Sequence, residues 1–180
     1  MTWQRNPTDD ELRAVLAQER YWFQKWEIRP GFVTPGKNDI TKIMADARVP
    51  ADLTGKRVLD IGSYTGTVAL ECERRGAAEV VALDLMDPTV TGFADLAEVL
   101  GSEVNWTNGS MYELDPGVHG TFDVVICFGV LYHLRWPIFG LDRMRTVTKD
   151  DASVHMETHV IDNHFVHPRT WLRQIGRAHV

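Results

Sequence analysis

The stretch Lys56-Arg-Val-Leu-Asp-Ile-Gly-Ser-Tyr-Thr-Gly66 decides the fold. Its apolar start predicts a buried strand over residues 57–61, which ends at an acid and a glycine-bearing turn. A helical pattern begins at once, over residues 66–75. Strand, turn and helix in direct succession are typical of a parallel sheet with helices on its faces. In such sheets a ligand binds beyond the carboxyl ends of the strands, where small residues let it approach the backbone.

The same alternation of strand and helix continues along the chain. Further strands are predicted at residues 79–84, 104–107, 122–128 and 152–158, and further helices at 91–100 and 137–148. Before them, a capping box at Thr8 and Glu11 begins an amphipathic helix predicted over residues 9–27. A turn-rich connector and a short helix at 39–47 follow. We therefore expect an N-terminal helical lid and connector over residues 1–52 and a Rossmann-like α/β domain over residues 53–174.

Composition limits the class of protein. The 180 residues are 44% apolar and 24% charged, which describes one globular domain with a core of its own. No basic segment precedes an apolar run at the start and no long apolar run occurs, so we expect a cytoplasmic protein without a membrane partner. The net charge of −6 disfavours nucleic acid as a general partner. Cys72 and Cys127 lie in apolar patterns and are predicted to be reduced core thiols.

The glycine turn and a second acid point to an adenosine-type cofactor. Gly62 and Gly66 are the expected points of close approach, and Asp84 ends the next predicted strand, where a carboxylate can accept both hydroxyls of a ribose. A dinucleotide fingerprint needs a middle glycine, but Tyr64 stands there, and no P-loop sequence is present. What remains is the pattern D-x-G-x-x-x-G, in which Asp60 can bind an ammonium group.

This pattern resembles the first motif of class I S-adenosyl-L-methionine (SAM) methyltransferases. The resemblance implies SAM as the cofactor, with the methionine portion at Asp60 and the glycine turn, the ribose at Asp84, and the adenine at Ser110 and Met111. The cofactor-binding positions that it predicts are Asp60, Gly62, Ser63, Tyr64, Gly66, Asp84, Leu85, Ser110, Met111 and Phe128.

A second motif, Phe128-Gly-Val-Leu-Tyr-His133, narrows the resemblance. With the glycine turn before it and Val154-His-Met-Glu-Thr-His-Val-Ile-Asp162 after it, it is similar to the branch of tRNA wobble-uridine 5-oxyacetate methyltransferases and carboxymethyltransferases. In carboxymethylating members, a Tyr and upstream basic residues hold the carboxylate of carboxy-SAM, and Tyr132 and Lys37 match such positions. Phe128 stands where those members tend to have Met, so ordinary SAM is the expected donor.

The acceptor side is predicted from the same loop. Tyr132 would orient an acceptor hydroxyl and His133 would take its proton near neutral pH, with Lys37 and Glu157 as substrate-binding residues. The alternative is that Tyr132 packs over the cofactor and His133 caps the following helix. His155, Glu157 and His159 share a strand face, but alternate residues on a strand lie about 7 Å apart, so we expect no metal site.

Three functions follow from these observations. The first is methyl transfer from SAM to a small-molecule acceptor, the second is modification of a tRNA wobble uridine, and the third is a truncated nucleoside-binding fold without catalysis. Residues 175–180 are predicted to be a non-native tail, and the last two strands of the family's sheet are expected to be missing. The fifth strand would then have an exposed edge through which the chain could form a homo-oligomer.

Overall fold

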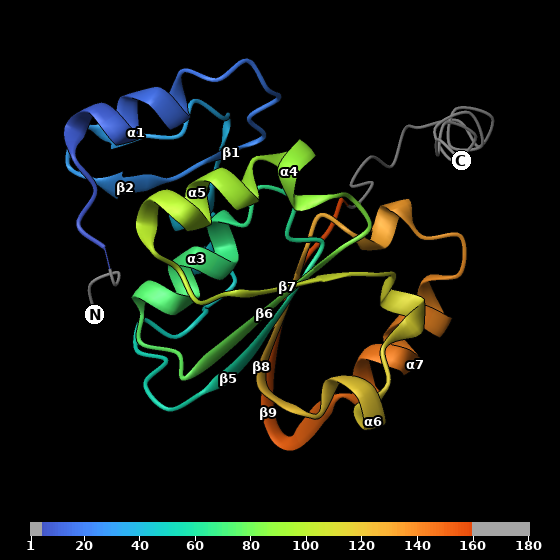
Figure 1. Cartoon of the computed structure of the whole chain (residues 1–180). Coiled ribbons are helices and arrows are strands. Elements are labelled where there is room, and N and C mark those ends of the chain that lie inside the picture. The colour runs from blue at the N-terminus through green and yellow to red at the C-terminus, as the bar shows by residue number, and fades with distance from the viewer. Residues whose placement is uncertain (1–4, 160–180) are drawn as a thin grey trace.

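A five-stranded parallel sheet forms the centre of the protein (Figure 1). The computed structural model describes residues 5–159. The strands are β5 (Arg57–Ile61), β6 (Glu79–Asp84), β7 (Asn105–Asn108), β8 (Phe122–Phe128) and β9 (Thr148–Glu157). Their order across the sheet is β7-β6-β5-β8-β9. The chain therefore moves outward from β5 in one direction and then returns to its other side, which creates the switch point where open parallel sheets bind ligands.

Helices cover both faces of the sheet, as Figure 1 shows. The helical elements are α3 (Thr67–Arg74), α4 (Pro88–Thr91), α5 (Phe93–Leu100), η1 (Met111–Glu113), α6 (Pro116–His119), η2 (Leu131–His133) and α7 (Pro137–Thr146). Elements α3 to α5 lie in the connections from β5 to β6 and from β6 to β7, α6 lies in the connection that crosses from β7 to β8, and α7 connects β8 with β9. This arrangement confirms the predicted Rossmann-like α/β fold, and the five predicted strands are all present within a few residues of their expected ends.

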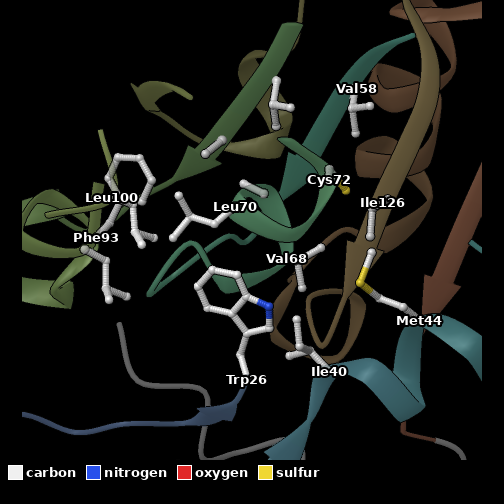
Figure 2. Packing of buried hydrophobic residues seen from close by; sticks show 14 of the residues in the cluster. Trp26, Ile40, Met44, Val58, Val68, Leu70, Cys72, Phe93, Leu100 and Ile126 are labelled. Carbon is white, nitrogen blue, oxygen red and sulfur yellow. The ribbon is translucent and has the colours of Figure 1, made fainter. Parts of the chain in front are cut away.

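Alternate residues of the central strands β5, β6 and β8 supply two separate hydrophobic clusters. Val58 and Ile126 pack with α3, α5 and the N-terminal segment, whereas Leu59 and Val125 pack on the opposite face with α7. Figure 2 shows the first cluster, in which the indole of Trp26 lies among side chains of the central domain. Because both faces of the sheet are buried at its centre, β5, β6 and β8 are apolar almost throughout, which explains why they were predictable as continuous apolar runs. The edge strands β7 and β9 are more polar and more exposed.

The N-terminal region differs from the predicted long helix. Its helix α1 (Asp9–Leu16) begins at the expected capping box but ends far short of residue 27. The remaining elements are β1 (Gln24–Lys25), β2 (Glu27–Arg29), β3 (Phe32–Val33), β4 (Asn38–Asp39) and α2 (Ile40–Asp46). β1 pairs with β4 and β2 pairs with β3, so the last residues of the expected helix belong instead to two small sheets that extend into the connector.

The physical reason for this difference is that the spacing of the apolar residues fits both a helix and a strand. Trp22 and Trp26 are four residues apart, which is one turn of a helix but also two steps along one face of a strand. The residues between them decide the matter: Gln24 is buried, whereas Phe23 and Lys25 are exposed. Burial thus alternates with the period of a strand, and the helix prediction beyond Leu16 was wrong.

The remaining predictions about the organisation of the chain concern residues or properties that the structure does not describe. The tail at 175–180 and any strands after residue 159 lie outside the described residues. The domain boundary at residue 53 and assembly through a sheet edge stay predictions. Within residues 5–159, every helix is too short or too polar to span a lipid bilayer.

Candidate functional site

The carboxyl ends of the five strands bring the predicted site residues to one edge of the sheet. Strand register places Asp84 beside Asn108, and Phe128 beside Glu157. The glycine turn follows β5 between these two pairs, and the amide N–H of Gly62 donates to the Leu83 carbonyl at 2.8 Å. The turn, the second acid and the loop after β8 therefore form one continuous edge at the switch point.

Asp84 is held by the backbone of two neighbouring loops. Its Oδ2 accepts the amide N–H of Tyr64 at 2.8 Å, and its Oδ1 accepts the amide N–H of Met86 at 2.8 Å. A carboxylate offers about four acceptor directions, so each oxygen retains one for a further donor. The result is an oriented, partly exposed pair of acceptors, which is the arrangement that a vicinal diol requires.

The glycine turn combines three left-handed residues. Gly62 has φ of 76°, Tyr64 has φ of 51° and Gly66 has φ of 74°. A Cβ at Gly62 would lie 2.3 Å from Cγ2 of Val130, and one at Gly66 would lie 2.2 Å from the Phe93 ring, so both glycines are sterically required. Tyr64 adopts this conformation with a full side chain, which costs about 1–2 kcal/mol relative to an ordinary backbone conformation. The departure from the usual motif is therefore accommodated without changing the course of the turn.

Asp60 lies beneath the turn rather than on its open surface. It is 2% exposed, and its Oδ2 accepts the Ser63 hydroxyl at 2.6 Å. Burial raises the pKa of Asp60 from 3.8 to about 7, and the hydrogen bond from Ser63 offsets only part of this effect. This position does not favour the expected direct contact with an ammonium group. Asp60 and Ser63 instead support the turn from inside.

Of the two residues expected to hold the adenine, Met111 is buried and Ser110 is partly buried. Met111 is 3% exposed and packs in the cluster under α7, so it does not line the open edge as expected. Ser110 caps η1, because its Oγ accepts the amide N–H of Tyr112 at 3.2 Å. Leu85 is 72% exposed and Met86 is 42% exposed, directly after Asp84. These two residues offer the apolar surface on this side.

Asn108 is a site residue that the sequence reasoning passed over. Its Nδ2 donates to the carbonyls of Asp84, Leu85 and Met86 at 3.3, 2.9 and 3.1 Å. One amide group thus holds the loop that carries the second acid. The only sequence signal was an Asn at the end of a strand, which more often marks a turn.

The loop after β8 gathers the expected acceptor-side residues. The Tyr132 ring lies 4.4 Å from the His133 ring and 4.7 Å from the His159 ring, between centroids. The negative charge of Glu157 adds to partial burial in raising the pKa of Tyr132. Tyr132 is 40% exposed, so this aromatic cluster is accessible at the edge of the sheet. His133 does not cap α7, because the residue at the N-cap of that helix is Trp136 and no side chain makes a capping hydrogen bond there.

Two other predicted positions contact other parts of the protein. Phe128 is partly buried and packs against the first hydrophobic cluster. Lys37 is exposed on the N-terminal region, where its backbone N–H donates to the Phe23 carbonyl at 3.1 Å.

Both ring nitrogens of His155 are engaged, with the Ala47 carbonyl and the Ser153 hydroxyl at 2.9 Å each. In residues 5–159, no three His, Cys, Asp or Glu side chains converge to hold a metal ion.

Comparisons with known proteins agree with this geometry. The family model described as a methyltransferase domain matches residues 38–179. Magnesium-protoporphyrin O-methyltransferase of Rhodobacter capsulatus is 37% identical over 139 residues, covering 77% of this chain and 54% of that protein. A tRNA U34 carboxymethyltransferase of Ectopseudomonas mendocina is 32% identical over 111 residues, covering 62% of this chain and 34% of that protein. The chain thus spans about half, or less, of the length of these relatives.

Solved structures share the fold. The N-terminal domain of EvdMO1, in the presence of SAH (S-adenosylhomocysteine) and D-fucose, matches with a TM-score of 0.61 and 22% identity, covering 84% of this chain and 66% of that one. A ribosomal protein L11 methylase from Lactobacillus delbrueckii subsp. bulgaricus matches with a TM-score of 0.54 and 20% identity, covering 67% of this chain and 60% of that one. With the glycine turn and Asp84 in place, the chain belongs to the methyltransferase-domain family, whose Rossmann-like fold takes S-adenosyl-L-methionine as the methyl donor.

Proposed function

We propose that this chain transfers a methyl group from SAM to a small-molecule acceptor. The observation that carries the proposal is the Asp84 carboxylate, held by the Tyr64 and Met86 amides with one acceptor direction free on each oxygen. Exposed Leu85 and Met86 follow Asp84 directly in the chain. The carboxylate that can accept hydrogen bonds from a diol therefore adjoins an apolar surface. The two carboxylate oxygens would accept the ribose hydroxyls of SAM, and the apolar surface would receive its adenine.

The reaction requires orientation more than strong acid or base chemistry. When bound, SAM would supply an electrophilic sulfonium methyl group for an acceptor lone pair, and SAH would be the leaving group. Asp84 would hold the ribose hydroxyls, and the turn from Gly62 to Gly66 would lie along the methionine portion. Holding the two reactants in line contributes much of the rate enhancement in such a displacement.

Residues after β8 and β9 would receive the acceptor. Tyr132 presents its phenol beside Glu157, and His133 packs against it, so these side chains can orient an acceptor hydroxyl and accept its proton. Lys37 stays a proposed substrate-binding residue on the N-terminal region. The buried, unpaired thiols of Cys72 and Cys127 support a cytoplasmic location.

The small-molecule acceptor has support from two directions. Relatives are named as O-methyltransferases of magnesium protoporphyrin and of ubiquinone biosynthesis, both small molecules. The net charge of −6 also gives no general attraction for a phosphate backbone. The second candidate acceptor is a tRNA wobble uridine, because the loop from Phe128 to His133 resembles that branch and several relatives are named tRNA U34 carboxymethyltransferase.

The first experiment measures SAH binding by titration calorimetry. Replacing Asp84 by Ala should weaken binding roughly 10- to 100-fold, because hydrogen bonds to a charged group contribute about 1.5–3 kcal/mol. Asp87→Ala is the matched control: it removes a carboxylate from the same loop, where Asp87 caps α4. NADH serves as the control ligand. Equal SAH affinity in the parent and the Asp84→Ala variant would refute the proposed site.

A second experiment separates the acceptors. The protein is incubated with SAM carrying a labelled methyl group and either bulk tRNA or a pool of small phenols and carboxylic acids. Label entering the small-molecule pool supports the proposal, and label entering tRNA supports the alternative. Tight SAH binding without transfer to either pool would favour a binding fold without catalysis.

A further inference from the structure

The glycine turn is held from a side that the methyltransferase motif does not include. The hydroxyls of Thr65 and Thr67 both donate to Oε1 of Gln24, each at 2.7 Å. Both threonines are fully buried, and Gln24 is 9% exposed. Gln24 lies 41 residues before Thr65 in the chain, on β1 of the N-terminal region. The Oε1 atom of Gln24 thus joins the N-terminal region to the end of the glycine turn at Thr65 and to the first residue of α3 at Thr67.

The backbone of Gln24 is itself fixed. Its carbonyl accepts the Thr34 hydroxyl at 2.7 Å, and its strand pairs with β4. A Cβ at Gly36 would lie 2.2 Å from the Gln24 carbonyl carbon, so a glycine is needed for this close approach. Two residues along, the Trp26 indole N–H donates to buried Glu71 of α3 at 3.0 Å. Gln24 is therefore a rigid support rather than a flexible surface contact.

This support acts at the most strained part of the turn. Tyr64 precedes Thr65 and adopts a left-handed conformation that a side chain disfavours. Its amide N–H is the one that holds Asp84 at 2.8 Å, and its hydroxyl donates to the Tyr21 carbonyl at 3.4 Å. The turn is thus fixed between Asp84 on one side and β1 on the other. Releasing it would free the Tyr64 amide that orients the acid.

We infer that Gln24 is a positioning residue for the cofactor, which acts through Thr65 and Thr67 to keep the Tyr64 amide directed at Asp84. The inference rests on the proposed function, because it assigns the turn to SAM. It also makes the N-terminal region a support of the glycine turn, and the role of that region as a lid stays a prediction. The family model begins at residue 38, so this support lies outside the matched domain.

The test compares variants of the full chain in SAH binding, at a temperature where each is folded. Gln24→Leu removes the shared acceptor and leaves the two hydroxyls without a partner, so SAH affinity should fall at least tenfold. Thr65→Ser/Thr67→Ser keeps both hydroxyls and should bind within about threefold of the parent. Trp26→Phe is the matched control, because it loosens the same region at Glu71 without touching the turn, and its affinity should stay within about threefold.

A spectroscopic readout separates positioning from stability. In ¹⁵N-labelled protein, Gln24→Leu should shift the amide resonances of Tyr64 and Gly66, whereas Trp26→Phe should leave them in place. If Gln24→Leu does not fold, Thr67→Val removes one of the two hydrogen bonds and should still weaken binding several-fold. If the parent binds SAH and the Gln24→Leu or Thr67→Val variant binds it with equal affinity, the inference is overturned. A parent that fails to bind SAH would overturn the proposed function itself.

Discussion

The buried carboxyl group of Asp60 predicts an unusual pH dependence of stability. Its pKa is about 7 in the folded protein, against 3.8 for an unperturbed aspartate. Between these values the folded state keeps a proton that the unfolded state has lost. The contribution of Asp60 to the free energy of unfolding is therefore fully present below about pH 4 and is lost as the pH rises through about 7.

Asp60→Asn removes this dependence and keeps a side chain of the same size. Each pKa unit corresponds to 1.36 kcal/mol. As the pH rises from 5 to 7.5, the free energy of unfolding of the variant should therefore increase by about 2–3 kcal/mol relative to that of the parent. Urea unfolding at several pH values and constant ionic strength measures the difference directly. Oδ1 of the asparagine can still accept the Ser63 hydroxyl, so the change removes the charge and keeps this hydrogen bond.

Asp123→Asn is the control for this experiment. The hydrogen bond from Lys149 lowers the pKa of Asp123, so its contribution is lost only as the pH falls below its ordinary range. The difference in the free energy of unfolding between Asp123→Asn and the parent should stay constant from pH 5 to pH 7.5. If the Asp60→Asn difference is equally flat, or grows toward acid, the buried and protonated state of Asp60 is wrong.

Two further predictions concern the backbone of the turn. Tyr64→Gly should be more stable than Tyr64→Ala by about 0.5–1 kcal/mol in urea unfolding, because only glycine adopts φ of 51° without strain; equal stability would mean that Tyr64 is not left-handed. Gly66→Ala should lower the free energy of unfolding by about 2 kcal/mol or more, since its Cβ would lie 2.2 Å from the Phe93 ring at φ of 74°; a neutral effect would contradict this packing.

Much of the central domain was predictable because its signals are local. Buried parallel strands appear as short apolar runs, and the glycine turn places residues 62 and 66 where no side chain fits. Asp84 was identified because an acid at the end of the second strand must lie beside the turn when the strands are parallel neighbours. The capping box at Thr8 and Glu11 likewise involves only four consecutive residues, and both of its hydrogen bonds are present.

The tertiary structure alone decided what depends on distant contacts. The spacing of Trp22 and Trp26 fits a helix and a strand equally well, and only pairing with β4 and burial against α3 select the strand. Burial of Asp60 and Met111 follows from packing on the sheet, which no local pattern reports. The contact from Gln24 to Thr65 spans 41 residues, so nothing near either residue announces it. Local periodicity thus determined the sheet and its turn, whereas long-range packing determined what holds the turn in shape.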